Sequence, residues 1–182
     1  MKTLVMTTAT SSLVLLFALF TISFPILTQS RVFLSTDAND VIVKTCKQTP
    51  FSDFCVSVLR DDPRSSGADV RGLALIMVGV LEAKSKETLS HIKDLAKTGP
   101  KQPLSFCADN YKAIITADVP EATEALNTGN YKFAEQGTND AANDADACEK
   151  RFSGSSPLTK MNKFVHDVAA VAAAMARILL TS

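Results

Sequence analysis

Several features that mark common protein classes are missing from this 182-residue sequence. It has no surplus of either charge, since 19 Lys and Arg side chains face 19 Asp and Glu side chains. Without a basic surplus we expect neither a nucleic acid nor a membrane surface as a partner. No Asn-x-Ser/Thr acceptor occurs, so N-glycosylation is not expected. A nucleophile elbow, a phosphate loop and a metal-ligand cluster are also absent, and we therefore expect neither an enzyme nor a cofactor or metal.

The first thirty residues have the composition of a targeting segment. They contain one charged residue, Lys2, and an apolar run over residues 13–24 that is short for a membrane span. This pattern predicts a secretory signal peptide over residues 1–30, cleaved after Ser30. No second hydrophobic segment of spanning length follows, so we expect a protein of the secretory pathway.

The rest of the chain has little of the alternating β-branched pattern of strands, and Ala, Leu, Lys, Glu and Asp dominate after residue 67. Glycine and proline gather at a few points, which separate four predicted helices at 69–97, 104–127, 131–152 and 158–180. Short connections make neighbouring helices antiparallel. The predicted fold class is therefore all-α, with an up-down-up-down four-helix bundle over residues 67–182. Pro120 is expected to kink the second helix, because it lacks a backbone donor.

Residues 31–66, ahead of the bundle, are predicted to form a short helical hairpin turned at Thr49-Pro50. Apolar side chains surround Cys46 and Cys55 in this hairpin.

The four cysteines, an even number in an exported chain, predict two disulfides. Cys107 lies about 20 residues before the turn at 127–130, and Cys148 lies about as far after it, so the two meet at similar height in an antiparallel pair. This predicts a Cys107–Cys148 disulfide and leaves Cys46–Cys55 to close the hairpin.

Three stretches carry a resemblance to a known family. They are KTCKQTPFSDFCVSVLRDDPRSSGADVRGLALIMV at 44–78, ADVPEATEALNTGNYKFAEQG at 117–137 and SGSSPL at 153–158. With the cysteine layout, they resemble the plant invertase and pectin methylesterase inhibitor family, in particular its invertase-inhibitor branch. The resemblance implies a non-catalytic protein of the cell wall (apoplast) or vacuole. Its implied partner is an acid invertase (β-fructofuranosidase), held in a one-to-one complex.

The invertase branch has a Pro-Lys-Phe motif at the start of a bundle helix, which enters the sucrose-binding cleft of the target. The matching residues here are Tyr131, Lys132 and Phe133, so the proline is not kept. Asn130 is expected to cap this helix, which puts Lys132 in the first turn, where the helix dipole disfavours a cation. A cation that breaks this rule between two aromatic residues is typical of an interface hot spot. The alternative is an ordinary surface lysine between two aromatics that pack on a neighbouring helix.

Other functions stay open at this point. The same scaffold can inhibit pectin methylesterase, and a helical bundle can carry a small ligand in an internal cavity or serve as a structural protein. The acidic residues of the third helix lack the spacing of a calcium loop, and we interpret them as a solvated helix face; they are Asp140, Asp144, Asp146 and Glu149.

Overall fold

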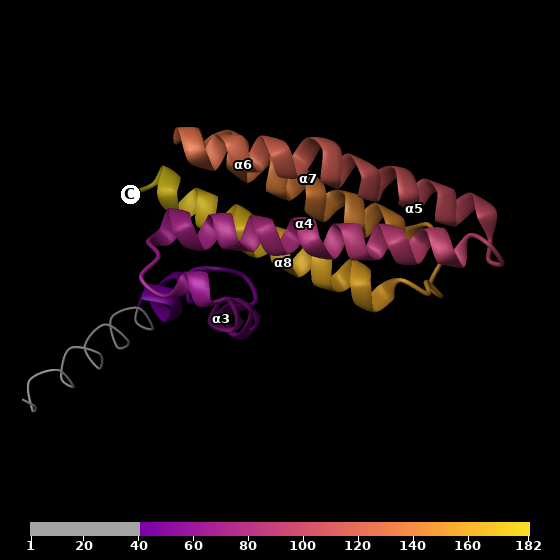
Figure 1. The fold of residues 1–182 in the computed structure, drawn as a ribbon, viewed down its shortest axis with the longest axis horizontal. Helices are drawn as coiled ribbons and strands as arrows, with labels where there is room; N and C mark the ends of the chain where they lie inside the picture. The colour runs from indigo at the N-terminus through magenta and orange to yellow at the C-terminus, as the bar shows by residue number, and fades with distance from the viewer. Residues whose placement is uncertain (1–40) are drawn as a thin grey trace, which may run out of the picture. The chain divides into compact units, whose positions relative to one another are not determined.

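The computed structural model describes residues 41–182, and Figure 1 shows their fold. The predicted signal peptide and residues 31–40 of the predicted hairpin lie outside the described residues. All regular elements in the described part are helical, which confirms the all-α prediction. None of these helices is long and apolar enough to cross a membrane. In order they are residues 41–46, α3 (Ser52–Asp61), the 3-10 helix η1 (Pro63–Ser65), α4 (Val70–Leu95), α5 (Lys101–Ala113), the π-helix η2 (Ile114–Asp118), α6 (Val119–Thr128), α7 (Tyr131–Lys150) and α8 (Thr159–Leu180).

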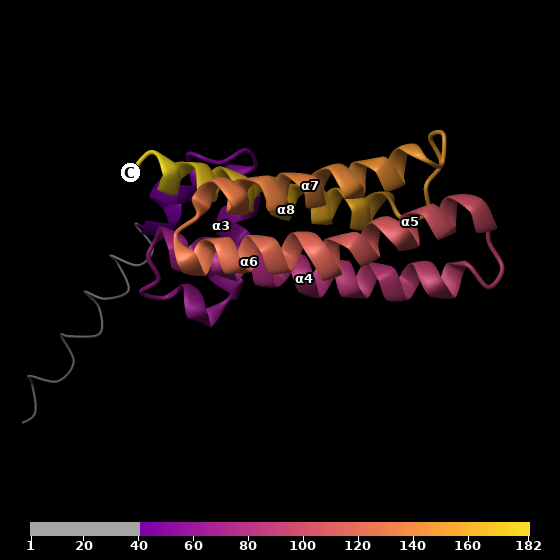
Figure 2. The same cartoon turned by 90° about the horizontal axis from the view of Figure 1, so that it is seen from above.

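Four long rods form the predicted antiparallel bundle, namely α4, the continuous α5–η2–α6 helix, α7 and α8 (Figures 1 and 2). Helix α8 packs against both α4 and α7, and the α5–α6 rod closes the other side against the same two helices. The α6–α7 turn, the start of α4 and the end of α8 share one end of the bundle. The Asp69 side chain begins α4 by accepting a hydrogen bond of 2.7 Å from the Gly72 N–H.

The second rod runs through a π-helical segment directly before Pro120. The N–H of Val119 donates to the carbonyl of Ile114, five residues back, as in a π-helix. Pro120 follows in the first turn of α6, and because the rod is continuous there, its missing N–H removes one bond from the helical ladder. The irregularity predicted at Pro120 thus takes the form of a widened turn just ahead of it.

Large side chains fill the centre of the bundle. The fully buried ones include Tyr111, Met77, Leu81, Ile114 and Met175. The Tyr111 hydroxyl donates to Asn162 Oδ1 at 2.8 Å, so the phenol is paired although it is buried.

Both predicted disulfides are confirmed. Cys107–Cys148 joins α5 to α7 across a Cα–Cα distance of 4.7 Å, and Cys46–Cys55 joins residues 41–46 to α3 across 5.6 Å. The chain reverses over residues 47–51, where the Thr49 hydroxyl donates to the Cys46 carbonyl.

Helix α3 packs on the bundle through aromatic contacts. The Phe54 ring meets the Phe164 ring of α8 edge-on, with centroids 5.2 Å apart. The Phe51 ring similarly meets His166 of α8 at 6.1 Å.

Candidate functional site

The α6–α7 turn carries the residues that the sequence singled out. Helix α6 ends at Gly129, whose φ of 77° lies in the left-handed region that glycine adopts without strain. The Asn130 N–H then donates to the Ala125 carbonyl at 2.8 Å, the long bond of a Schellman motif. Because Gly129 reverses the chain so tightly, α7 begins at Tyr131, at the very end of the bundle.

Asn130 occupies the predicted capping position, but its side chain does not cap α7. The Asn130 amide instead donates to the Thr128 hydroxyl at 3.0 Å, back toward α6. The first turn of α7 is closed by the Asn130 carbonyl, which accepts from the Phe133 and Ala134 N–H groups at 2.9 and 3.3 Å. The prediction of a side-chain cap was therefore wrong, and the Asn130 side chain is instead bonded to the end of α6 through its amide group.

The three motif residues do not share one environment. Tyr131 is partly buried and packs against the hydrophobic core. Lys132 is exposed, and the Phe133 side chain leaves 54% of its surface in water. A helix advances about 100° per residue, so Tyr131 shares a face with Ala134 and Thr138, whereas its two successors turn outward. The structure thus brings Lys132 and Phe133 together as an exposed pair, with Tyr131 behind them.

An exposed aromatic beside an exposed cation is a suitable contact surface for another protein. Lys132 forms no ion pair with any residue of the described part of the chain. It lies beside the unpaired N–H groups that begin α7, which carry partial positive charge. Cation and helix end together favour an anionic partner at this tip.

An ion pair between α7 and α8 supports the same turn of α7. Glu135, one turn after Tyr131, accepts a hydrogen bond of 2.7 Å from Arg177 Nε, and Arg177 Nη2 donates to the same oxygen. Sequence reasoning missed these two residues. The equal-height argument that paired Cys107 with Cys148 also pairs them, because both lie near the same end of antiparallel helices.

Helices α6 and α7 approach closely behind the tip. A Cβ built on Gly137 of α7 would lie 2.9 Å from the Asp118 carbonyl oxygen, so only glycine fits. Asp118 Oδ2 is buried without a hydrogen-bond partner. Burial, together with the charges of Asp144, Asp140 and Glu121, raises the pKa of Asp118 to about 6. This carboxyl therefore titrates in the weakly acidic range.

The acidic residues of α7 are only in part the solvated face that the sequence predicted. Asp140 is exposed, but burial and the charge of Asp140 raise the pKa of Asp144. Glu149 is bonded to α8, since its two oxygens accept from the Thr159 hydroxyl and the Asn162 amide, both at 2.6 Å. Glu149 is thus not a purely solvated residue, because it is partly buried and bonded to α8. No group of metal-ligating side chains suitable for an ion occurs within residues 41–182.

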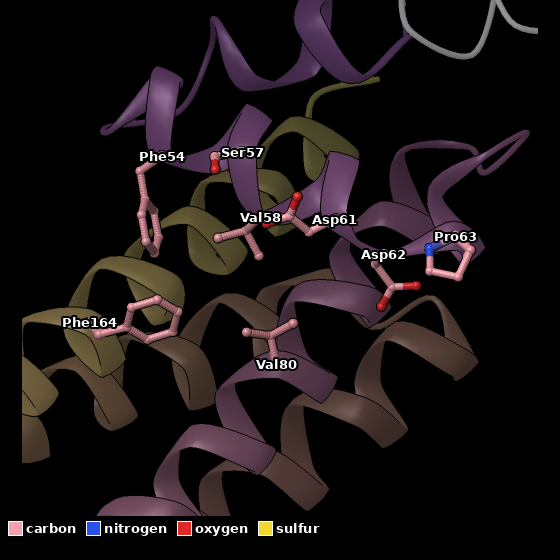
Figure 3. Close-up of a pocket in the computed structure, with 8 residues that line it drawn as sticks. All are labelled: Phe54, Ser57, Val58, Asp61, Asp62, Pro63, Val80 and Phe164. Atoms are coloured by element: carbon pink, nitrogen blue, oxygen red, sulfur yellow. The ribbon is translucent and has the colours of Figure 1, made fainter.

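A groove of about 520 Å³ lies between α3, α4 and α8 (Figure 3). Phe54, Val58, Val80 and Phe164 form its apolar walls. Asp61 and Asp62 stand at one side, and Asp62 is paired with Arg64 at 2.6 Å. None of the predicted site residues lines this groove.

Comparison with known families decides what kind of protein carries this tip. The model of a family described as plant invertase/pectin methylesterase inhibitor matches residues 40–175. The chain belongs to this family. It is a family of inhibitors and not of enzymes, which confirms the expectation of a non-catalytic protein.

The curated relatives of this chain include inhibitors of fructosidase and inhibitors of pectinesterase. The chain is 44% identical over 137 residues to cell wall / vacuolar inhibitor of fructosidase 1 of Arabidopsis thaliana, which covers 74% of this chain and 67% of the relative. Its identity to inhibitor of fructosidase 2 of the same plant is 36%, over 56% of this chain and 57% of the relative. A pectinesterase inhibitor of Actinidia deliciosa is 29% identical, over 64% of each chain. The chain thus spans between about half and two thirds of the length of these relatives.

A solved structure shares the fold. The crystal structure of a mutant form of a pectin methylesterase inhibitor from Arabidopsis superposes with a TM-score of 0.65 and covers 73% of this chain and 93% of the other. The two sequences are 20% identical, so this likeness concerns the helical fold of the inhibitor family alone.

Proposed function

We propose that this family member inhibits a plant acid invertase by placing Lys132 and Phe133 in the sucrose-binding cleft of the enzyme. The observation that carries the proposal is the exposed Lys132–Phe133 pair at the first turn of α7. The 44% identity to a protein named as a fructosidase inhibitor supports an invertase over a pectin methylesterase as the target.

The chemistry of the pair suits such a cleft. A retaining glycosidase carries two carboxyl groups about 5 Å apart in a site shielded from water. The Lys132 ammonium, free of an ion pair within residues 41–182, can form a charge-assisted contact with these carboxylates in place of the sugar. The Phe133 ring adds an apolar face of the kind that dominates interface hot spots.

Tyr131 supports the exposed pair by packing on the hydrophobic core. The position of proline in the family motif is occupied here by Tyr131, whose side chain packs on the core. Proline would fix the first helical turn through its ring, whereas Tyr131 anchors the same turn by burial. We therefore assign Tyr131 a supporting part, and target contact to its two successors.

The compartment and stoichiometry follow from the same proposal. Two disulfides suit an oxidising compartment of the secretory pathway, and the cell wall or the vacuole is where acid invertase would be met. A single exposed tip at the end of the bundle fits one enzyme active site, so we propose a one-to-one complex.

The packing of the bundle weighs against a ligand carrier. Tyr111, Met77 and Met175 occupy its centre without exposed surface, which is where a carrier would need space.

The decisive experiment mixes the oxidised protein with a purified acid invertase at acidic pH and follows sucrose hydrolysis. Lys132→Ala should weaken inhibition at least about tenfold, because it removes a charge from a desolvated contact. Lys160→Ala is the matched control, since Lys160 is also an exposed lysine in the first turn of a helix, α8, at the opposite end of the bundle.

Two outcomes would contradict the proposal. Equal inhibition by Lys132→Ala and the unmodified protein would remove the tip from the contact. If the protein inhibits a purified pectin methylesterase and leaves invertase active, its target is pectin methylesterase.

A further inference from the structure

The carboxylate of Glu135 has two basic side chains within reach, and the structure selects one of them. Lys132 precedes Glu135 by three residues on α7, a spacing that places side chains next to each other on a helix. Arg177 reaches Glu135 from the last turn of α8. Glu135 Oε1 accepts from both Arg177 Nε and Nη2, whereas Lys132 has no ion-pair partner among residues 41–182.

The geometry explains why Arg177 prevails. Two N–H groups of its planar guanidinium, Nε and Nη2, donate to Glu135 Oε1. The Glu135 side chain is also only 20% exposed and lies on the α8 side of the helix. The other residue at helical spacing from Lys132 is Gln136, which is uncharged.

We propose that Arg177 is a positioning residue of the inhibitory tip, an inference that rests on the proposed function. By holding Glu135 against α8, Arg177 prevents Glu135 from pairing with Lys132 on the same helix. The ammonium then reaches the target without first leaving an internal partner. The Arg177–Glu135 pair also balances the negative charge of Glu135, which lies three residues from Lys132 on α7.

Removing Arg177 tests the inference, because it leaves the Glu135 carboxylate without its partner. Arg177→Gln frees the Glu135 carboxylate, and inhibition of acid invertase should weaken about threefold to tenfold, more at low salt than at high salt. Glu135→Gln combined with Arg177→Gln removes the freed charge, and inhibition should return to within about twofold of the unmodified protein. A purely structural role of Arg177 predicts no such rescue.

Arg151→Gln is the matched control for loss of an arginine. Arg151 follows α7 at its other end, where its guanidinium lies over the Phe106 ring, and its removal should leave inhibition unchanged. Thermal unfolding of each variant checks that the bundle is intact, and we expect small changes because the Arg177 side chain is 64% exposed and such ion pairs contribute little to stability.

A second measurement needs no invertase. The NMR signals of the Lys132 ε-methylene and ammonium groups in the free protein should shift in Arg177→Gln and return in the double variant. Unchanged Lys132 signals, or a double variant that inhibits as weakly as Arg177→Gln, would overturn the inference. If the unmodified protein fails to inhibit invertase, the proposed function fails, and the NMR comparison still decides whether Arg177 keeps Glu135 from Lys132.

Discussion

The hydroxyl of Tyr111 on α5 and the side chain of Asn162 on α8 form a buried hydrogen bond of 2.8 Å. Asn162 extends this hydrogen bond into a network, because its amide donates to Glu149 of α7 at 2.6 Å. Three of the four rods are therefore joined by polar side chains close to the Cys107–Cys148 bridge. Buried polar contacts of this kind fix which helices pack together as well as how tightly.

Tyr111→Phe should lower the free energy of unfolding by about 1 to 2 kcal/mol, because it leaves the buried Asn162 oxygen unpaired. Urea denaturation measures the change. Thr116→Val removes a hydroxyl whose bond to the Lys112 carbonyl is exposed, and should cost less than about 0.5 kcal/mol. Equal stability of Tyr111→Phe and the unmodified protein would show that the network adds nothing.

Phe133→Ala and Tyr131→Ala should separate contact from support. Phe133 is exposed, so its removal should change stability by less than about 0.5 kcal/mol yet weaken invertase inhibition about tenfold. Tyr131 packs on the core, so Tyr131→Ala should destabilise the protein by about 1 to 3 kcal/mol. Thermal unfolding and sucrose hydrolysis are measured on both variants, and the reverse pattern would contradict the assignment.

Stability should depend on pH through Asp118. Its pKa is about 6 in the folded protein against a reference of 3.8, so the folded state holds the proton more strongly. The contribution of Asp118 to the free energy of unfolding should therefore be largest below about pH 4, fall as pH rises from about 4 to about 6, and change little above that. Asp118→Asn should flatten this dependence and raise stability at pH 7 on the order of 1 kcal/mol, since the carboxyl is partly exposed and screened.

Asp109→Asn is the control for this titration, because Asp109 is an exposed carboxylate of α5. Unfolding midpoints measured from pH 4 to pH 7 decide the matter. If the unfolding midpoint of Asp118→Asn depends on pH as that of the unmodified protein does, the dependence arises from other groups.

The two disulfides should differ in how much each contributes to the free energy of unfolding. Cys107–Cys148 closes a loop of 41 residues and Cys46–Cys55 one of 9. Chain entropy gives about 4 kcal/mol for the longer loop and about 2.5 kcal/mol for the shorter one. Paired Cys→Ala variants compared by urea denaturation test the order, and a larger loss from the short loop would contradict it.

The helix ends could be predicted because glycine and proline mark them. The predicted helix 131–152 became α7, Tyr131–Lys150, since Gly129 can adopt the left-handed conformation that ends α6 two residues before it. The Cys107–Cys148 bridge was likewise predictable from equal distances to that turn. The first result depends on local backbone rules, and the second on the antiparallel packing that a short turn imposes on two neighbouring helices.

The details of the tip depend on tertiary contacts and were harder to predict. The periodicity of α7 already places Tyr131 on the face of Ala134 and Thr138, but the family motif suggested three residues acting together. The Asn130 side chain does not cap α7, and its amide donates to Thr128, a contact that the capping rule does not predict. The π-helical segment before Pro120 has no sequence signature, because any of several nearby turns can widen to accommodate a proline.

The position of Lys132 between Cys107 and Cys148 bears on how the protein would withstand proteolysis. A protease that cuts after this exposed lysine would divide the chain in two, yet the disulfide would still hold the fragments together. The nicked molecule would migrate as an intact chain on a gel until a reducing agent was added, and only then would its two pieces separate.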